Sequence, residues 1–408
     1  MIDNAASDVR APAVTPVGGR RARVGFWLTA AVYTLVMLGG TLPIPLYAFW
    51  APQMGFGPFT TTLVFAVYAL GTVLALMVFA SLSDRAGRRP LLSAALLAAA
   101  TSTALFLVAH DVETLLAARF LCGLSTGVFT ATATAALGEL AGAEHTRRAS
   151  TVSAVANTGG PGLGTLAAGL FAQYGADSTH LVFWCYLAGL VPAFLAVLVT
   201  PETVVPRQRP ALSVRRPVLP GRRTARTEFL RAATAVLAAF AVSGLFSSLV
   251  PSFLREQLHV HTVAAVGAQV GLLFLVALVA QVAAPERWVS GRRPAPAFLA
   301  AGVAVFETGL WTRSLPLFAA GTLLAGAGIG LAFRRGIGVT QRLADPQRRA
   351  DLLSTYFLFA YTGTIVPTLA LGLLDQTVNQ DVATLILAVT VVATTLAGAL
   401  SRPTGATA

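Results

Sequence analysis

The stretch SDRAGRRP, from Ser83 to Pro90, places four charged side chains between two long apolar runs. An aspartate here can pair with arginines or with the positive end of a neighbouring helix. A solvated loop that only fixes orientation in a membrane is the alternative, but such a loop needs neither an aspartate nor a glycine. The stretch therefore predicts a charged contact at the membrane face, formed by Asp84, Arg85, Gly87, Arg88 and Arg89.

Two further charged residues lie within apolar runs. Arg119 is about five residues from one end of its run, and Glu307 is the only carboxylate well inside one. A charge at the centre of a lipid-facing helix costs roughly 2.5–3.5 kcal/mol or more, so such residues are candidates for substrate binding or proton coupling. The alternatives are that Arg119 reaches the lipid headgroups and that Glu307 pairs with Arg313.

Residues that could form an enzyme or metal site are sparse. Glu256, His259 and His261 provide three candidate metal ligands in one short loop, without a fourth. The sequence contains no phosphate-binding P-loop motif, which argues against an ATP-driven pump. We therefore expect no enzymatic activity, no metal and no cofactor.

The composition is that of a membrane protein. Of the 408 residues, 55% are hydrophobic and only 11% are charged, whereas soluble domains carry about 25% charged residues. This excess of apolar surface requires a lipid bilayer as its solvent.

The net charge of +12 comes from 29 basic residues, all of them arginine. If the N-terminus is cytoplasmic, only Arg119, Arg255 and Arg313 do not fall at the cytoplasmic face. This is the positive-inside distribution, so the basic charge predicts topology in the inner cell membrane rather than nucleic-acid binding. Arginine in place of every lysine, with abundant alanine and valine, indicates a GC-rich bacterial genome.

Twelve apolar segments are long enough to cross a bilayer as helices. They lie roughly at 26–48, 60–80, 91–109, 114–137, 149–173, 181–199, 229–250, 263–284, 295–311, 315–335, 351–373 and 382–400. The first contains Thr41 and Tyr47 near Pro43 and Pro45, which interrupt the backbone hydrogen bonds of a helix. Two interpretations of this segment remain: Thr41 and Tyr47 contact a substrate, or the prolines only kink the helix.

The two halves of the chain repeat each other. GRRP occurs at 87–90 and again at 291–294, and Gly123 and Gly127 match Gly326 and Gly330. Six spans per half give the halves the same orientation, with a pseudo-twofold axis along the membrane normal. The predicted fold is an all-α membrane protein of twelve transmembrane helices in two six-helix bundles. The expected divisions are a cytoplasmic tail (1–25), a bundle (26–200), an arginine- and proline-rich cytoplasmic linker (201–228), a second bundle (229–400) and a cytoplasmic tail (401–408).

These motifs resemble those of the major facilitator superfamily, over nearly the whole chain. SDRAGRRP is similar to the family's loop between spans two and three, although Ala80 stands where a glycine is usual. RFLCGLSTG, with Arg119 and Gly123, resembles the fourth-span motif. GPGLG, with Gly160, Pro161 and Gly164, resembles the fifth-span motif of antiporters, and Pro201-Glu202-Thr203 is similar to an ending frequent among drug exporters.

The resemblance implies that Asp84 holds the two bundles together in one state and releases them in another. It places Arg119 against a central cavity, and it gives the GPGLG motif the role of sealing a leak path; small-residue packing is the alternative for these glycines. The first span has no acidic residue, which removes one site where proton-driven exporters of the family keep a carboxylate.

The expected function is secondary active transport of a small organic molecule by alternating access, as proton-coupled efflux. One chain contains a complete transport path, so we expect a monomer with its substrate, protons and the lipid bilayer as partners. An uptake or facilitative metabolite carrier of the same fold is the alternative. A non-transporting membrane sensor or scaffold is a third reading, which the intact gating loop disfavours.

Overall fold

The computed structural model describes residues 19–79, 82–175, 179–204, 217–256, 258–260, 262–344, 349–374, 376, 378 and 380–400. Within these ranges the chain is almost entirely helical, as the recurrence of apolar runs predicts. The tails at 1–18 and 401–408, and much of the expected linker, lie outside the described residues. The first helix begins at Gly19, seven residues before the predicted apolar run at Phe26.

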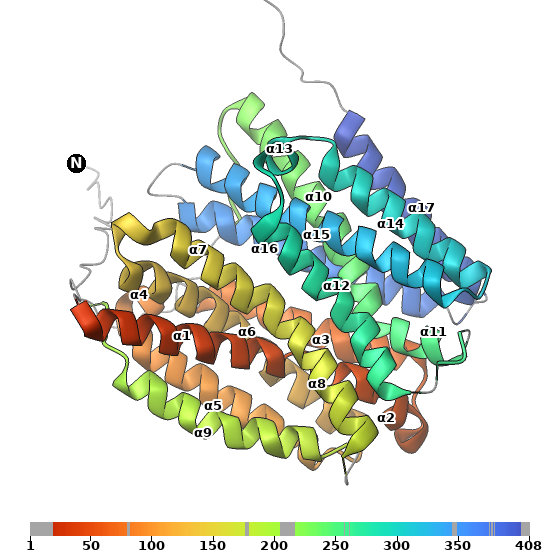
Figure 1. Cartoon of the computed structure of the whole chain (residues 1–408), viewed down its shortest axis with the longest axis horizontal. Helices are drawn as coiled ribbons and strands as arrows, with labels where there is room; N and C mark the ends of the chain where they lie inside the picture. Colours follow the sequence, from red (N-terminus) through yellow and green to blue (C-terminus); the bar gives the residue numbers. More distant parts are fainter. Residues whose placement is uncertain are drawn as a thin grey trace, which may run out of the picture.

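Two six-helix bundles make up the fold, and both are visible in Figure 1. The N-terminal bundle contains α1 (Gly19–Gly39), α3 (Pro58–Val78), α5 (Arg88–Leu107), α6 (Val112–Ala141), α8 (Gly160–Tyr174) and α9 (Leu181–Val199). Its shorter elements are η1 (Ile44–Leu46), α2 (Tyr47–Met54), α4 (Ser83–Ala86), η2 (Ala143–His145), α7 (Thr146–Ala154) and the π-helical turn η3 (Val155–Gly159).

The C-terminal bundle repeats this plan. Its long helices are α10 (Arg223–Ser248), α12 (Val263–Ala283), α14 (Pro294–Trp311), α15 (Leu315–Leu343), α16 (Arg349–Leu374) and α17 (Gln380–Leu400), with α11 (Val250–Glu256) and α13 (Glu286–Ser290) as short elements. Nine of the described helical stretches are long and apolar enough to cross a membrane. The broken span α7–η3–α8, together with α14 and α17, completes the predicted twelve.

Glycine pairs show the repeat in atomic detail. Side chains at Gly123 and Gly127 of α6 would collide with α3, where the Thr72 carbonyl oxygen lies 2.6 Å from the Cβ position of residue 127. Gly326 and Gly330 of α15 approach α12 in the same way, with the Leu273 carbonyl oxygen at 2.7 Å from the Cβ position of residue 326. Small residues let helix backbones approach closely in a membrane. The matched glycines therefore set the same helix crossing in both bundles.

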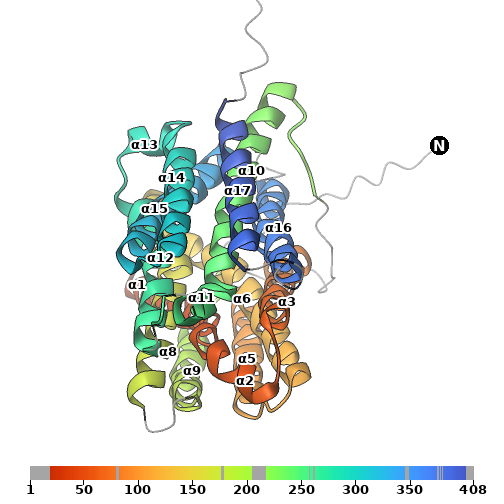
Figure 2. The same ribbon diagram turned by 90° about the vertical axis from the view of Figure 1, so that its right-hand side faces the viewer.

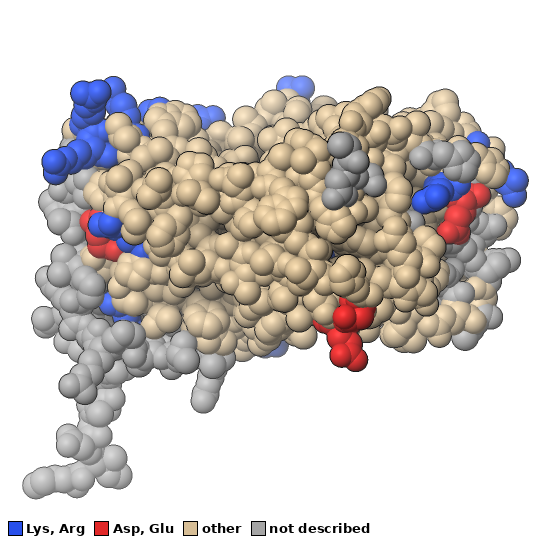
Figure 3. Space-filling model, turned by 90° about the horizontal axis from the view of Figure 1, so that it is seen from below, with Lys and Arg blue, Asp and Glu red and all other residues tan. Residues whose placement is uncertain are grey.

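The surface separates into an apolar middle and two charged ends. Large apolar side chains of α9, such as Trp184, Val191 and Val199, are more than half exposed. In Figure 3 most charged side chains of the face shown lie toward the two ends of the long axis. We call the end that carries Arg20, Arg88, Arg147, Arg223 and Arg292 the arginine-rich end. The end that carries α2 and α11 is the opposite end.

The bundles meet along two helix pairs, α8 with α12 and α3 with α16. Both Figure 1 and Figure 2 show α8 beside α12. Hydrogen bonds between described residues cross this seam: Gln281 Nε2 donates to Thr158 Oγ1 at 2.9 Å, and the Val263 N–H donates to Gln173 Oε1 at 2.9 Å. At the opposite end α2 also contacts α11.

Candidate functional site

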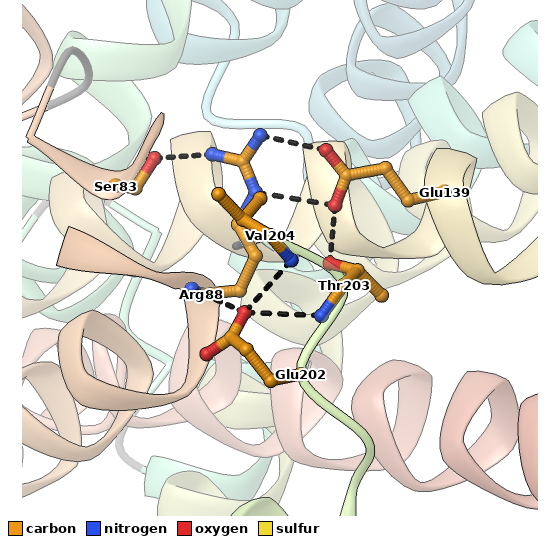
Figure 4. Close-up of polar contacts among 6 residues, drawn as sticks. All are labelled: Ser83, Arg88, Glu139, Glu202, Thr203 and Val204. Carbon is orange, nitrogen blue, oxygen red and sulfur yellow. Dashed lines mark hydrogen bonds and ion pairs between the residues drawn. The ribbon is translucent and has the colours of Figure 1, made fainter. Parts of the chain in front are cut away.

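The SDRAGRRP loop is held by a buried ion pair within the N-terminal bundle. The Arg88 guanidinium donates to Glu139 of α6 through Nε at 3.2 Å and Nη2 at 2.7 Å, and to Ser83 Oγ at 2.5 Å. Figure 4 shows this fork, in which Glu139 also accepts from the Thr203 hydroxyl. Arg88 is only 5% exposed. The contact therefore fixes the start of α5 against the end of α6.

Glu202 joins the same cluster from the segment after α9. Its carboxylate accepts the backbone N–H of Arg88 at 2.8 Å and of Arg89 at 3.0 Å, which are the first N–H groups of α5. It also accepts the N–H groups of Thr203 and Val204. A carboxylate at a helix N-terminus satisfies unpaired donors and complements the helix dipole. The Pro201-Glu202-Thr203 segment thus caps α5, the helix that follows the SDRAGRRP loop.

Gly87 lets the Glu202 carboxylate approach the start of α5. Its φ of 103° lies in a region that L side chains rarely adopt, and an added Cβ would lie 2.8 Å from Glu202 Oε2. The glycine of the motif is therefore required both by its backbone conformation and by the carboxylate beside it.

We expect Gly87→Ala to lower the free energy of unfolding by about 1–3 kcal/mol, since strain and a displaced cap add together. Gly142→Ala is the matched control, because Gly142 has a φ of 74° with open space around its Cβ position. Thermal unfolding in detergent should show the larger loss for Gly87→Ala. Equal losses would mean that the Glu202 contact is unimportant.

The other loop residues are placed only in part. The Asp84 backbone is in α4, but its side chain lies outside the described residues, so its gating role stays a prediction. Arg85 is half-buried, and the Arg89 guanidinium donates to the Leu198 carbonyl oxygen of α9. Sequence reasoning did not identify Glu139 as a partner, although it is a carboxylate near the end of the fourth apolar run.

The first span is broken where the two prolines predict. After α1 ends at Gly39, the Ile44 N–H bonds to the Thr41 carbonyl oxygen instead of reaching back to Gly40. Pro43 and Pro45 have no N–H to donate. The Gly40 carbonyl is thereby released from the helix, and it accepts a hydrogen bond from Arg119 Nη1 at 2.8 Å.

Arg119 is fully buried inside the N-terminal bundle, at 0% exposure. Its Nε donates to Tyr47 Oη at 2.5 Å, and its guanidinium carbon lies 5.1, 5.5 and 5.8 Å from the ring centres of Tyr47, Tyr68 and Phe106. Its Nη2 is buried without a hydrogen-bond partner among the described residues. Neutral acceptors and aromatic faces, rather than a carboxylate, therefore surround this cation.

Gly123 and Thr41, which the sequence singles out, help to position the helices around Arg119. Gly123 lets α3 approach, which carries Tyr68 over the guanidinium. Thr41 donates to the Pro161 carbonyl oxygen at 2.8 Å. The structure thus places Tyr47, Arg119 and Gly123 together. Tyr47, Tyr68 and Phe106 form an aromatic cage around the guanidinium, and the sequence did not predict Tyr68 and Phe106 as its members.

The GPGLG motif follows the π-helical turn η3. Pro161 cannot donate to the carbonyl four residues earlier, and the helix loosens into the wider turn just before it. Thr158 of this turn is the residue that accepts from Gln281 of the other bundle. The irregular backbone of the fifth span therefore lies on the seam between bundles.

The motif presents glycines on two faces of α8. Gly160 and Gly164 lie against α1, where the Cβ position of residue 160 is 2.9 Å from the Thr34 carbonyl oxygen. Gly162 lies against α12, with Leu275 Cγ at 3.0 Å from its Cβ position. The α1 face joins α8 to its own bundle, whereas the α12 face is the contact with the other bundle.

We expect Gly164→Ala to lower the free energy of unfolding by about 1–3 kcal/mol, because its Cβ would overlap the Leu38 carbonyl oxygen. Gly138→Ala is the matched control: this exposed helical glycine has open space, so alanine should be neutral or stabilising by up to about 1 kcal/mol. Thermal unfolding of the two variants in one detergent gives the comparison. A Gly164→Ala protein as stable as the parent would refute the close packing of α8 on α1.

Glu307 is buried at 5% exposure in the C-terminal bundle, on α14. The Thr384 hydroxyl of α17 donates to its Oε2 at 3.4 Å. Glu307 thus lies between two helices of the C-terminal bundle, whereas Arg119 lies in the N-terminal bundle.

Of the three candidate metal ligands, His261 lies outside the described residues, and no group of potential metal ligands occurs in the part that is described.

Comparisons with known proteins agree with this architecture. The family model of the Major Facilitator Superfamily matches residues 29–366. A bacterial homologue of the human lysosomal transporter Spinster, in an inward-facing and occupied conformation, has a TM-score of 0.68 at 16% identity, covering 93% of this chain and 97% of that one. The human organic anion transporter MFSD10 (TETRAN) has a TM-score of 0.64 at 20% identity, covering 93% and 98%.

No curated protein matches the chain in sequence. At these identities the solved structures establish the fold alone, whereas the family model extends over most of the sequence. Two repeated six-helix bundles, the charged loop between the second and third spans and the matched family model lead to one conclusion. The chain is a member of the major facilitator superfamily of membrane transporters.

Proposed function

We propose that the protein exports a small organic molecule from the cytoplasm in exchange for protons, by alternating access. The observation that supports this proposal is the seam between the bundles, where glycines of α8 and α12 let the helix backbones approach closely. Such a seam lets two rigid bundles tilt against each other. Transporters of repeated bundles work by this relative motion around a fixed site.

The buried cation favours a site in the N-terminal bundle. Arg119 is held at the break of the first span, where a released carbonyl and the Tyr47 hydroxyl meet it. We propose that tilting opens this region to the substrate, with Arg119 contacting a polar or anionic group. Glu307 is the proposed proton carrier, because it is a carboxylate buried in a span.

The proposed orientation places the arginine-rich end and both termini in the cytoplasm, in the inner cell membrane. Of the described arginines, only Arg255 and Arg313 lie at the opposite end. The positive-inside rule supports this choice. We propose a monomer as the working unit.

The experiment uses cells without their own exporters, challenged with a panel of fluorescent organic anions and cations. Export predicts that expressing cells exclude at least one compound, whereas accumulation would show an uptake carrier. Purified protein in vesicles that contain a pH-sensitive dye should then move protons when that compound is added. Substrate flux that ignores an imposed pH gradient would refute proton exchange, and no flux of any compound would favour a sensor or scaffold.

A further inference from the structure

A cavity lies at the arginine-rich end of the C-terminal bundle, among α10, α14, α15 and α17. Its volume is about 50 Å³, whereas one water needs roughly 10–15 Å³ by the same measure. Arg231, Arg292 and Arg335 line it, and Glu228 is the one acidic residue among its described lining residues. The cavity thus combines a positive charge with room for a tetrahedral oxyanion.

The single negative charge of Glu228 is shared between the arginines of the cavity and a fourth arginine, Arg342. Its Oε1 lies 2.6 Å from Nη2 of Arg342, in an ion pair at the edge of the cavity. Arg335 donates from Nη1 to the Gly291 carbonyl oxygen, which fixes the turn that carries Arg292. Among the described residues, Arg231, Arg292 and Arg335 of the cavity and Arg342 at its edge therefore lie around Glu228.

The internal repeat allows the charged residues of this cavity to be compared with those around Arg88 in the first half. Arg292 occupies the position in GRRP that Arg88 occupies in the first half, and the glycine pairs of α6 and α15 align Glu139 with Arg342. In the first half, Glu139 and Glu202 neutralise the cluster. In the second half Arg342 stands at the position of Glu139.

We infer that this cavity binds an anionic phosphate group, which supplies the negative charge that Glu139 supplies in the first half. Arginine forks match phosphate oxygens, and basic pockets between transmembrane helices bind anionic headgroups. The group can belong to a phospholipid headgroup or to a free phosphate. The helix α17, which lines the cavity with Thr394 and Thr395, also exposes the apolar side chains of Ile386 and Val389.

The test compares Arg292→Gln with Arg293→Gln in the full chain, purified and delipidated in detergent. Both arginines are exposed and adjacent in sequence, but only Arg292 lines the cavity. Native mass spectrometry measures retention of phosphatidylglycerol against phosphatidylcholine. Thermal unfolding with added inorganic phosphate measures binding of the free anion, and Arg231→Gln provides a second cavity variant.

We expect the parent and Arg293→Gln to bind one of the two probes, and both cavity variants to bind it about tenfold more weakly, as for one charge-assisted contact. Loss confined to phosphatidylglycerol assigns the site to a lipid headgroup, and loss confined to inorganic phosphate assigns it to a free anion. Equal binding by Arg292→Gln and Arg293→Gln, or no preference for phosphatidylglycerol and no effect of phosphate, would overturn the inference. This inference does not depend on the cargo or on the direction of transport.

Discussion

Replacing Arg119 with methionine is expected to abolish transport while changing the free energy of unfolding by less than about 2 kcal/mol. A buried cation without a carboxylate partner is destabilising by roughly 2.5–3.5 kcal/mol in a membrane span. Its removal relieves this term but leaves the Gly40 carbonyl unsatisfied, which costs about 1–3 kcal/mol. The two effects nearly cancel, so a large loss of transport would be functional rather than structural.

Two further variants define what Arg119 contributes. Arg119→Lys keeps the charge but loses the planar fork that reaches Tyr47 and Gly40 together, so transport should fall at least tenfold. Tyr47→Phe keeps the ring beneath the guanidinium and removes only the hydroxyl. Dye export from cells and thermal unfolding of the purified variants are the measurements. Full transport by Arg119→Met would exclude Arg119 from the transport mechanism.

Glu139→Gln is expected to lower the free energy of unfolding by about 3–5 kcal/mol, because it removes the negative charge of the carboxylate that pairs with the buried Arg88 guanidinium. Glu286→Gln is the matched control. It breaks the Arg334–Glu286 pair, whose carboxylate is 77% exposed, and exposed pairs contribute about 0–1 kcal/mol. Denaturant titration in a single detergent gives both values.

A double variant distinguishes the ion pair from its surroundings. Arg88→Met with Glu139→Leu should recover much of the loss, because both charges of the buried pair are then removed together. Similar losses for Glu139→Gln and Glu286→Gln would show that the cluster at the arginine-rich end does not hold α5 to α6.

The sequence predicts those parts of the fold that depend on local pattern. Apolar runs define the spans, the repeated glycine pairs define the two bundles, and Pro43 and Pro45 predict the break in the first span. These signals lie within one segment or recur in register, so no knowledge of the packing is required. The same pattern carries the family assignment, which the family model confirms.

Partners across the fold could not be predicted in this way. Glu139 and Glu202 lie 51 and 114 residues from Arg88 along the chain, and nothing in their own segments indicates which arginine they meet. The cage around Arg119 depends on the path of the chain after Gly39, which releases one carbonyl and turns Tyr47 inward. Motif matching identified GPGLG but could not show that its glycines face two different helices.

We propose that the two bundles move apart at the opposite end during transport. There α3 meets α16, and a Cβ at Gly372 would lie 3.1 Å from Thr62 Cβ. Cysteines at the two positions are therefore near disulfide geometry, in which Cβ atoms are about 3.5–4.5 Å apart. Such a bond would fix the opposite end of the seam without touching Arg119 or Glu307.

The most direct measurement uses Thr62→Cys with Gly372→Cys, in a chain whose own Cys122 and Cys185 are replaced by alanine and serine. Export of a fluorescent substrate is followed before oxidation, after oxidation and after reduction, with the extent of cross-linking read from gel mobility. The account predicts that the cross-linked protein does not transport and that reduction restores export, while each single-cysteine protein is insensitive to oxidant. Export by fully cross-linked protein at the rate of the reduced protein would contradict alternating access by movement of the bundles.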